Sequence, residues 1–164
     1  MVDRSQENLQ QYAPVLVRAF LQYGLPGVWG LAISHQETAG TFNPNLRNLS
    51  GGDGARGGSY GLCQVSLRTA QAYQSDITPE SLIVPGTNAD IAARICLDAN
   101  KRFPGSLMNV AALYNDGKPF ASTRLAASTR DIYVPNVLRY ANLHALLAEQ
   151  IEKQINAEPN SSEG

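Results

Sequence analysis

Glu37 is the residue of this sequence best suited to proton-transfer chemistry. It is the only charged residue between Arg18 and Arg47, and it follows the apolar residues 28–33. The spacing of these residues predicts a helix over residues 28–38. Burial and the partial negative charge at a helix C-terminus both raise the pKa of a carboxyl group. We therefore expect Glu37 to be protonated near neutral pH and to act as a general acid. The alternative is an exposed polar residue at a helix end.

Short segments around and beyond Glu37 resemble, in order, the motifs of one family. They are Glu37-Thr38-Ala39-Gly40 with Phe42-Asn43-Pro44, then Tyr60-Gly61-Leu62-Cys63-Gln64-Val65, Ala111-Ala112-Leu113-Tyr114-Asn115-Asp116-Gly117, and Tyr133-Val134-Pro135-Asn136-Val137. The family is that of the soluble lytic transglycosylases and goose-type lysozymes, which cleave peptidoglycan and belong to the lysozyme-like superfamily. The resemblance covers about residues 28–145.

The resemblance implies roles for individual residues. Glu37 would be the catalytic acid, and the substrate-binding residues would be Thr38, Tyr60, Gln64, Tyr114, Asn115 and Tyr133. The rings of Tyr114 and Tyr133 would stack on sugars, and the Tyr133 hydroxyl would point toward the carboxyl group of Glu37. The amide of Gln64 can donate and accept hydrogen bonds, which suits an N-acetyl group or a glycan hydroxyl. The alternatives are that Gln64 ties the glycine-rich segment to a helix and that Asn115 shapes its own loop.

Four positions depart from the family pattern. Thr38 stands where Ser is usual, and Cys63 stands in place of Met. Asp116 replaces a small residue and adds a charge at the expected edge of the cleft. Ser128 occupies a position where many transglycosylases have Glu, so a second carboxylate is missing there.

Two reactions fit the resemblance. A lytic transglycosylase breaks the β-1,4 bond between N-acetylmuramic acid and N-acetylglucosamine and forms a 1,6-anhydro ring with the substrate's own C6 hydroxyl. A goose-type lysozyme hydrolyses the bond instead, and Asp53, in a glycine-rich segment, could position the water. Asp53 could equally be a turn residue that binds backbone amides. A third possibility, from another class, is a non-catalytic glycan-binding or structural module. We expect the transglycosylase.

Helical periodicity predicts a mainly α (α+β lysozyme-like) single domain. Six glycines between residues 51 and 61 predict a small β hairpin beside the cleft. Ser66 is expected to cap a helix, Thr78-Pro79-Glu80 to start a short helical turn with Pro79 at its first position, and one long helix is expected from about Thr129. The catalytic domain would span residues 1–155, and residues 156–164 would form a disordered tail.

Composition excludes several classes of protein. The 164 residues are 43% hydrophobic and 16% charged with a net charge of −1, which excludes intrinsic disorder and predicts no nucleic-acid partner. No apolar run approaches the length of a membrane span. Cys63 and Cys96 are expected to be buried thiols, and His35 and His144 lack a ligand pattern, so neither a metal nor another cofactor is predicted.

The N-terminus lacks the features of a secretory signal. We therefore expect action on the cell wall in the periplasm, through phage delivery or an envelope-spanning assembly, unless the chain has been trimmed. The expected partner is the glycan strand of peptidoglycan.

Overall fold

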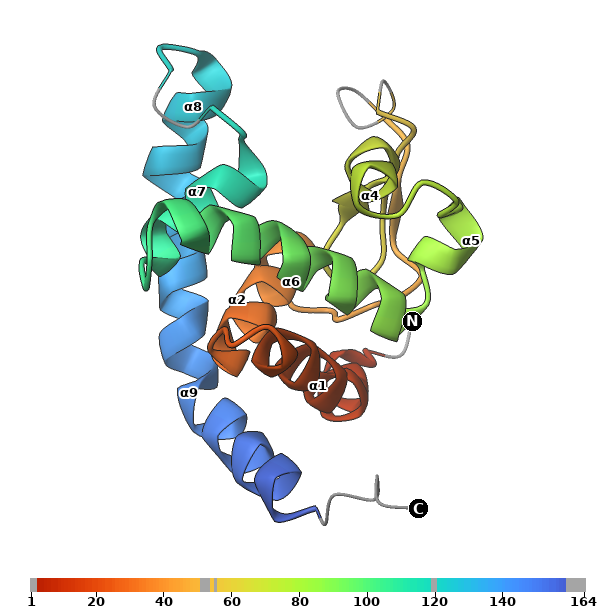
Figure 1. Cartoon of the computed structure of the whole chain (residues 1–164), viewed down its shortest axis with the longest axis vertical. Coiled ribbons are helices and arrows are strands. Elements are labelled where there is room, and N and C mark those ends of the chain that lie inside the picture. The colour runs from red at the N-terminus through yellow and green to blue at the C-terminus, as the bar shows by residue number, and fades with distance from the viewer. Residues whose placement is uncertain (1–2, 51–53, 55, 119–120, 159–164) are drawn as a thin grey trace.

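The computed structural model describes residues 3–50, 54, 56–118 and 121–158, and it is mainly helical with a small sheet (Figure 1). The helices are α1 (Ser5–Gln22), α2 (Gly27–Glu37), α4 (Leu67–Tyr73), α5 (Pro79–Leu82), α6 (Pro85–Arg102), α7 (Leu107–Asn115), α8 (Arg124–Ser128), the π-helix η1 (Thr129–Tyr133) and α9 (Val134–Ala157). The strands β1 (Arg47–Asn48), β2 (Ser59–Tyr60) and β3 (Val65–Ser66) form an antiparallel sheet in the order β1-β2-β3. Among the described helices, none is both long and apolar enough to cross a membrane. The mainly α lysozyme-like fold class predicted from sequence is confirmed.

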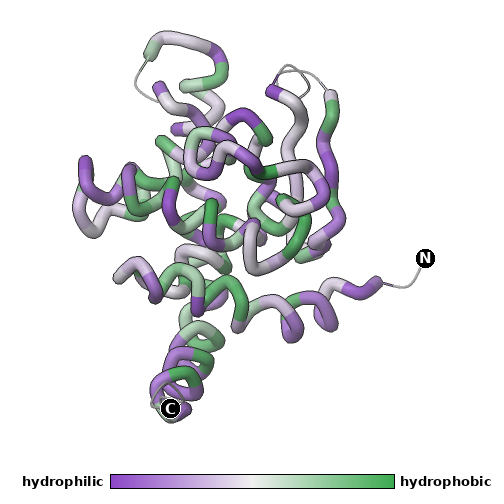
Figure 2. The backbone as a smooth tube through the Cα atoms, turned by 45° about the vertical axis from the view of Figure 1, so that its right-hand side comes forward, coloured by the Kyte–Doolittle hydropathy of each residue, from purple (hydrophilic) through white to green (hydrophobic). Residues whose placement is uncertain are grey.

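α2 lies at the centre of the fold and packs against α1, α6 and α9 (Figure 1). Most of its residues are buried, which explains why its sequence is apolar on every side rather than on one face. Gly27 and Gly30 let α1 approach closely, since a Cβ atom at Gly30 would lie 2.8 Å from the Phe20 ring and one at Gly27 would lie 2.6 Å from Val17. The outer helices instead alternate between apolar and polar residues along their length (Figure 2). The helix is therefore tightly packed up to Ser34, and its last turn, which ends at Glu37, is half-buried.

Several predicted features are confirmed. The side chains of Ser66 and Thr78 accept hydrogen bonds from the first turns of α4 and α5, as expected of N-caps. Cys63 and Cys96 are free and buried, and burial raises the pKa of both thiols.

The glycine-rich segment and the C-terminal helix differ in detail from the prediction. The segment includes only β2, and β1 and β3 on either side of it in sequence make a sheet of three short strands instead of a two-stranded hairpin. The last helix is preceded by α8 and by one π-helical turn, η1, which a 3.6-residue period does not reveal. α9 extends to Ala157, and the next residue, Glu158, forms an exposed ion pair with Arg18 at 2.9 Å. The rest of the predicted tail, residues 159–164, lies outside the described residues.

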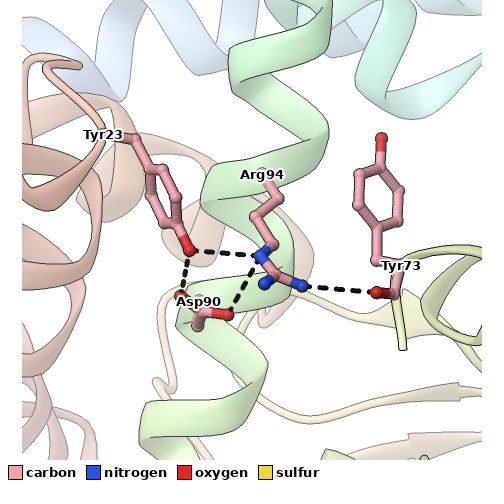
Figure 3. Close-up of polar contacts among 4 residues, drawn as sticks. All are labelled: Tyr23, Tyr73, Asp90 and Arg94. Atoms are coloured by element: carbon pink, nitrogen blue, oxygen red, sulfur yellow. Dashed lines mark hydrogen bonds and ion pairs between the residues drawn. The ribbon is translucent and has the colours of Figure 1, made fainter.

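A polar cluster joins three helices on the side of α6 that faces α1 and α4 (Figure 3). The Tyr23 hydroxyl donates to Asp90 at 2.6 Å, and Arg94 Nε donates to the same hydroxyl at 3.1 Å. Arg94 also reaches the backbone carbonyl of Tyr73 at 3.4 Å. Because Asp90 accepts the hydrogen bond of Tyr23, the pKa of that phenol is raised. The cluster fixes α6, which forms part of the site described below, against its neighbours.

Two histidines that are distant in sequence meet between α2 and α9. His35 Nδ1 and His144 Nε2 share a hydrogen bond of 2.8 Å, and His144 is only 6% exposed. We call these residues the histidine pair. Burial lowers the pKa of both imidazoles, that of His144 to about 4, and the nearby charge of Arg139 lowers that of His35 further. The folded protein therefore favours a neutral pair.

The histidine pair predicts that the free energy of unfolding falls as the pH is lowered. The unfolded chain takes up protons near pH 6.5, whereas His144 in the folded state takes one up only near pH 4. Stability is therefore complete above about pH 6.5 and lost progressively below it, by about 2–3 kcal/mol at about pH 4.5. Urea unfolding at a series of pH values measures this loss. The double variant His35→Gln/His144→Gln should lose much less over the same interval, and an equal loss in that variant would assign the effect to other groups.

Candidate active site

The carboxyl group of Glu37 lies on the wall of a cavity of about 480 Å³. Glu37 is half-buried at the last residue of α2. The cavity lies between α2, the sheet, α6 and α7, and its wall includes Arg56, Gln64, Val65, Tyr114 and Asn115. Among the described residues of this wall, Glu37 is the only carboxylate and Arg56 the only cation. A hollow of about 670 Å³ between the start of α1 and residues 41–45 is larger, but it contains none of the predicted site residues.

Tyr133 forms a hydrogen bond with the carboxyl group of Glu37. Its hydroxyl donates a hydrogen bond of 2.5 Å to Glu37 Oε1, which confirms the predicted orientation. Tyr133 is 8% exposed and belongs to η1. Burial, together with the nearby carboxylate, raises the pKa of this phenol well above its usual value. Tyr133 therefore remains a hydrogen-bond donor throughout the neutral pH range.

Tyr114 and Gln64 form adjoining parts of the cavity wall. The hydroxyl of Tyr114 donates to the carbonyl of Cys63 at 2.6 Å, so it is used to join α7 to the segment before β3. Gln64 Nε2 donates to the carbonyls of Leu46 and Gly61 at 3.1 and 3.0 Å. The Gln64 amide thus ties the sheet segment together, and its Oε1 has no hydrogen-bond partner among the described residues. The predicted tie to a helix is therefore replaced by a tie within the sheet segment, because both acceptors lie outside the helices.

Asn115 is on the cavity wall and is also anchored by a structural contact. Its Nδ2 donates to Thr129 Oγ1 at 2.7 Å, and Thr129 Oγ1 in turn donates to the carbonyl of Leu125 at 2.9 Å. Asn115 therefore connects the end of α7 to η1, the turn that carries Tyr133. π-helical turns are often found at functional sites.

Three of the predicted binding residues, Thr38, Tyr60 and Tyr133, do not belong to the wall of this cavity. The Thr38 hydroxyl donates to the carbonyl of Ser34 at 2.7 Å and accepts from the amide of Phe42 at 2.9 Å. It thereby stabilises the loop after Glu37, in which Ala39 has a positive φ of 51°. Tyr60 is 5% exposed, and its hydroxyl donates to the carbonyl of Gly57. Asp53, the predicted water-positioning residue, lies outside the described residues.

Asn88 supports the site but was not identified from sequence. It is fully buried, accepts a hydrogen bond from the amide of Cys63 at 2.8 Å, and donates to the carbonyls of Tyr60 and Leu82 at 2.7 and 2.9 Å. A Cβ atom at Gly61 would lie 2.5 Å from Asn88 Nδ2, so only glycine fits there. The sequence does contain one signal for Asn88: it is a polar residue three positions before Ile91, on the apolar face of α6.

The chemistry that the site can support is proton transfer by a carboxyl group. The described residues contain no group of three or more His, Cys, Asp or Glu side chains that could bind a metal ion. A carboxyl group on the wall of a polar cavity, oriented by a buried phenol, can give a proton to a bound oxygen atom and take one back.

Comparison with known proteins identifies a family for most of the chain. The family model of the transglycosylase SLT domain matches residues 18–131. The matched segment includes Glu37, the sheet, Tyr114 and Asn115, and it ends just before Tyr133. No curated protein and no solved structure matches the chain.

Proposed function

Because the chain belongs to the transglycosylase SLT domain family, we propose that it is a lytic transglycosylase that uses Glu37 as its catalytic acid and base. The family match supports a transglycosylase-type action on peptidoglycan and the cell wall. The proposal adds the bond that is cleaved, the β-1,4 bond between N-acetylmuramic acid and N-acetylglucosamine, and the 1,6-anhydro product. The observation that carries it is the carboxyl group of Glu37, which lies on a cavity wall and accepts a hydrogen bond from Tyr133.

In the first step, protonated Glu37 gives its proton to the glycosidic oxygen. The bond from this oxygen to C1 of N-acetylmuramic acid breaks, and N-acetylglucosamine leaves with a free 4-hydroxyl group. Positive charge develops at C1, where the substrate's own N-acetyl group stabilises it. Glu37 is now ionised, and the hydrogen bond from Tyr133 is stronger to a carboxylate than to a neutral carboxyl group.

In the second step, Glu37 removes the proton of the C6 hydroxyl group of N-acetylmuramic acid. The oxygen attacks C1 and closes the 1,6-anhydro ring, and Glu37 is protonated again. No water is consumed, and the nucleophile is part of the substrate, so its proximity supplies much of the rate. This mechanism needs one carboxylate, whereas most glycosidases need two. It therefore suits a wall on which Glu37 is the only carboxylate among the described residues.

Other residues of the wall suit a glycan strand. The ring of Tyr114 offers a face for a sugar, and Gln64 Oε1 and Asn115 offer polar atoms for hydroxyl and N-acetyl groups. Arg56 is exposed on the same wall, where it can meet the carboxylates of peptidoglycan. We assign Thr38 and Tyr60 to positioning the loops that flank Glu37 and Gln64, because their hydroxyl groups bind backbone atoms.

Tyr133→Phe should lower kcat about 10- to 100-fold, because a hydrogen bond to a charged group contributes about 1.5–3 kcal/mol. The phenyl ring keeps the packing of Tyr133, so KM should change little. Initial rates of release of soluble fragments from purified peptidoglycan measure both constants. Tyr12→Phe is the matched control, because Tyr12 is half-buried on α1 and away from the cavity. Equal rates for the two variants would show that the Tyr133 hydroxyl has no part in catalysis.

The proposed reaction is tested by mass spectrometry of peptidoglycan digested with the protein. Transglycosylation gives anhydro-muropeptides that are lighter by one water, about 18 Da, than the products of hydrolysis. Reducing ends would instead identify a hydrolase and direct attention to Asp53. Intact glycan strands that nevertheless bind the protein would identify a non-catalytic binding module.

A further inference from the structure

The histidine pair lies close to the Glu37–Tyr133 contact but outside the cavity. His35 is two residues before Glu37 on α2, and neither histidine belongs to the wall of the cavity beside Glu37. Neither side chain is therefore placed to touch a bound glycan. Any effect that these residues have on catalysis must be exerted through Glu37 or Tyr133.

The surroundings of the histidine pair hold both rings in fixed orientations. The ring of Tyr140 stacks on His35 with a centroid distance of 3.7 Å and an angle of 11°. Phe42 meets the rings of His35 and His144 edge-on at 5.6 and 5.8 Å. A Cβ atom at Gly40 would lie 2.9 Å from His35 Nε2, so the loop after Glu37 packs directly on this imidazole. The pair is thus packed against the loop that follows Glu37.

The two contacts lie at well-separated points on the C-terminal helical segment. Tyr133, which binds Glu37, immediately precedes α9, whereas His144, which binds His35, is about three turns further on, roughly 16 Å along the helix. Glu37 and His35, by contrast, belong to the same last turn of α2. Glu37 and His35 therefore fix the end of α2 to this segment at two distant points. Loss of the His35–His144 hydrogen bond would leave the Glu37–Tyr133 hydrogen bond and side-chain packing to hold this turn.

We propose that the hydrogen bond between His35 and His144 positions Glu37 for catalysis by preventing the last turn of α2 from pivoting about its contact with Tyr133. The inference rests on the proposed function, since it assigns positioning residues to that reaction. Catalytic groups lose rate steeply when displaced, by up to about 100-fold for a shift of about 1 Å. Loss of the pair should therefore lower kcat about 10-fold, with KM changed less than about two-fold because the rest of the cavity wall is unaltered.

The test compares four single variants and one double variant of the full chain on purified peptidoglycan. His35→Ala and His144→Ala remove the hydrogen bond from either side. His144→Gln is the conservative variant, because its amide reaches the position of Nε2, and it should restore most of the lost kcat. Leu143→Ala is the matched control, since Leu143 is next to His144 but 64% exposed. Circular dichroism melts show which variants are folded at the assay temperature.

Each result either supports or overturns the proposal. A lower kcat in both alanine variants, with KM retained and recovery in His144→Gln, supports it. The double variant His35→Ala/His144→Ala should then lose no more than either single variant, because both remove the same bond. A wild-type kcat in a folded alanine variant overturns it, as does a change confined to KM. If His144→Ala is unfolded, the kcat and KM of His35→Ala decide between these outcomes, because His35 is only half-buried and its replacement should be better tolerated. Absence of peptidoglycan cleavage by the wild-type protein would instead refute the proposed function.

Discussion

Replacing Glu37 by Gln is expected to lower the rate of peptidoglycan cleavage by about 10³- to 10⁴-fold. Glutamine has nearly the shape of glutamate and can still accept the hydrogen bond from Tyr133, but it can neither give a proton to the glycosidic oxygen nor take one from the C6 hydroxyl group. Binding to peptidoglycan should persist. The rate is measured from the release of soluble muropeptides, and binding is measured by sedimentation with insoluble peptidoglycan.

Glu152→Gln is the matched control for this prediction. Glu152 is also half-buried and accepts a hydrogen bond of 3.2 Å from the amide of Gly27 at the other end of α2. Its amide variant should cleave peptidoglycan at nearly the wild-type rate. If Glu37→Gln also cleaved at that rate, the carboxyl group of Glu37 could not be the acid. If it lost binding as well as cleavage, Glu37 would be needed to hold the glycan rather than to transfer a proton.

Replacing Asn88 by Ala is expected to lower the free energy of unfolding by about 3–5 kcal/mol. The change leaves the buried carbonyls of Tyr60 and Leu82 and the buried amide of Cys63 without their partner, and each unsatisfied group costs about 1–3 kcal/mol. Because Asn88 contacts the chain on both sides of Gly61, its loss should also disturb Gln64 and slow cleavage in whatever fraction remains folded. Chemical unfolding followed by circular dichroism measures the first effect.

Asn8→Ala is the control for Asn88, because Asn8 makes a single exposed hydrogen bond, to the carbonyl of Thr41 at 2.9 Å. It should cost no more than about 1 kcal/mol. Gly61→Ala tests the same contact by changing the partner of Asn88. The new Cβ atom would clash with the Asn88 amide, and the φ of +78° at position 61 disfavours alanine. Losses at Asn88 and Gly61 no larger than that of Asn8→Ala would mean that this buried contact does not hold the sheet to α6.

The elements that could be predicted from sequence are those with local signals. The apolar spacing in α6 and α9 and the N-caps Ser66 and Thr78 are written in neighbouring residues, and the structure confirms them. The short strands are different, because each has two residues and its register depends on contacts with Asn88 and Gln64 rather than on its own sequence. The π-helical turn η1 is also hard to predict, because one such turn changes the spacing of apolar residues along the helix too little to be detected.

The candidate site was predictable only in part for a related reason. Glu37 was singled out by its isolation among apolar residues, and Tyr133 by the motif that contains it. The contact between His35 and His144 joins residues that are 109 positions apart and follows no local pattern. Whether the hydroxyl groups of Thr38 and Tyr60 face a cavity or their own backbone depends on loop conformation, which residue types alone do not determine.

A crystal structure of the Glu37→Gln variant with a bound peptidoglycan fragment would locate the reacting bond directly. We expect the fragment in the cavity between the sheet and α7, with the glycosidic oxygen about 3 Å from the side chain at position 37 and a sugar ring against Tyr114. A fragment bound instead in the larger hollow between α1 and residues 41–45, or one whose glycosidic bond lies beyond the reach of position 37, would contradict the central claim that this carboxyl group performs the cleavage.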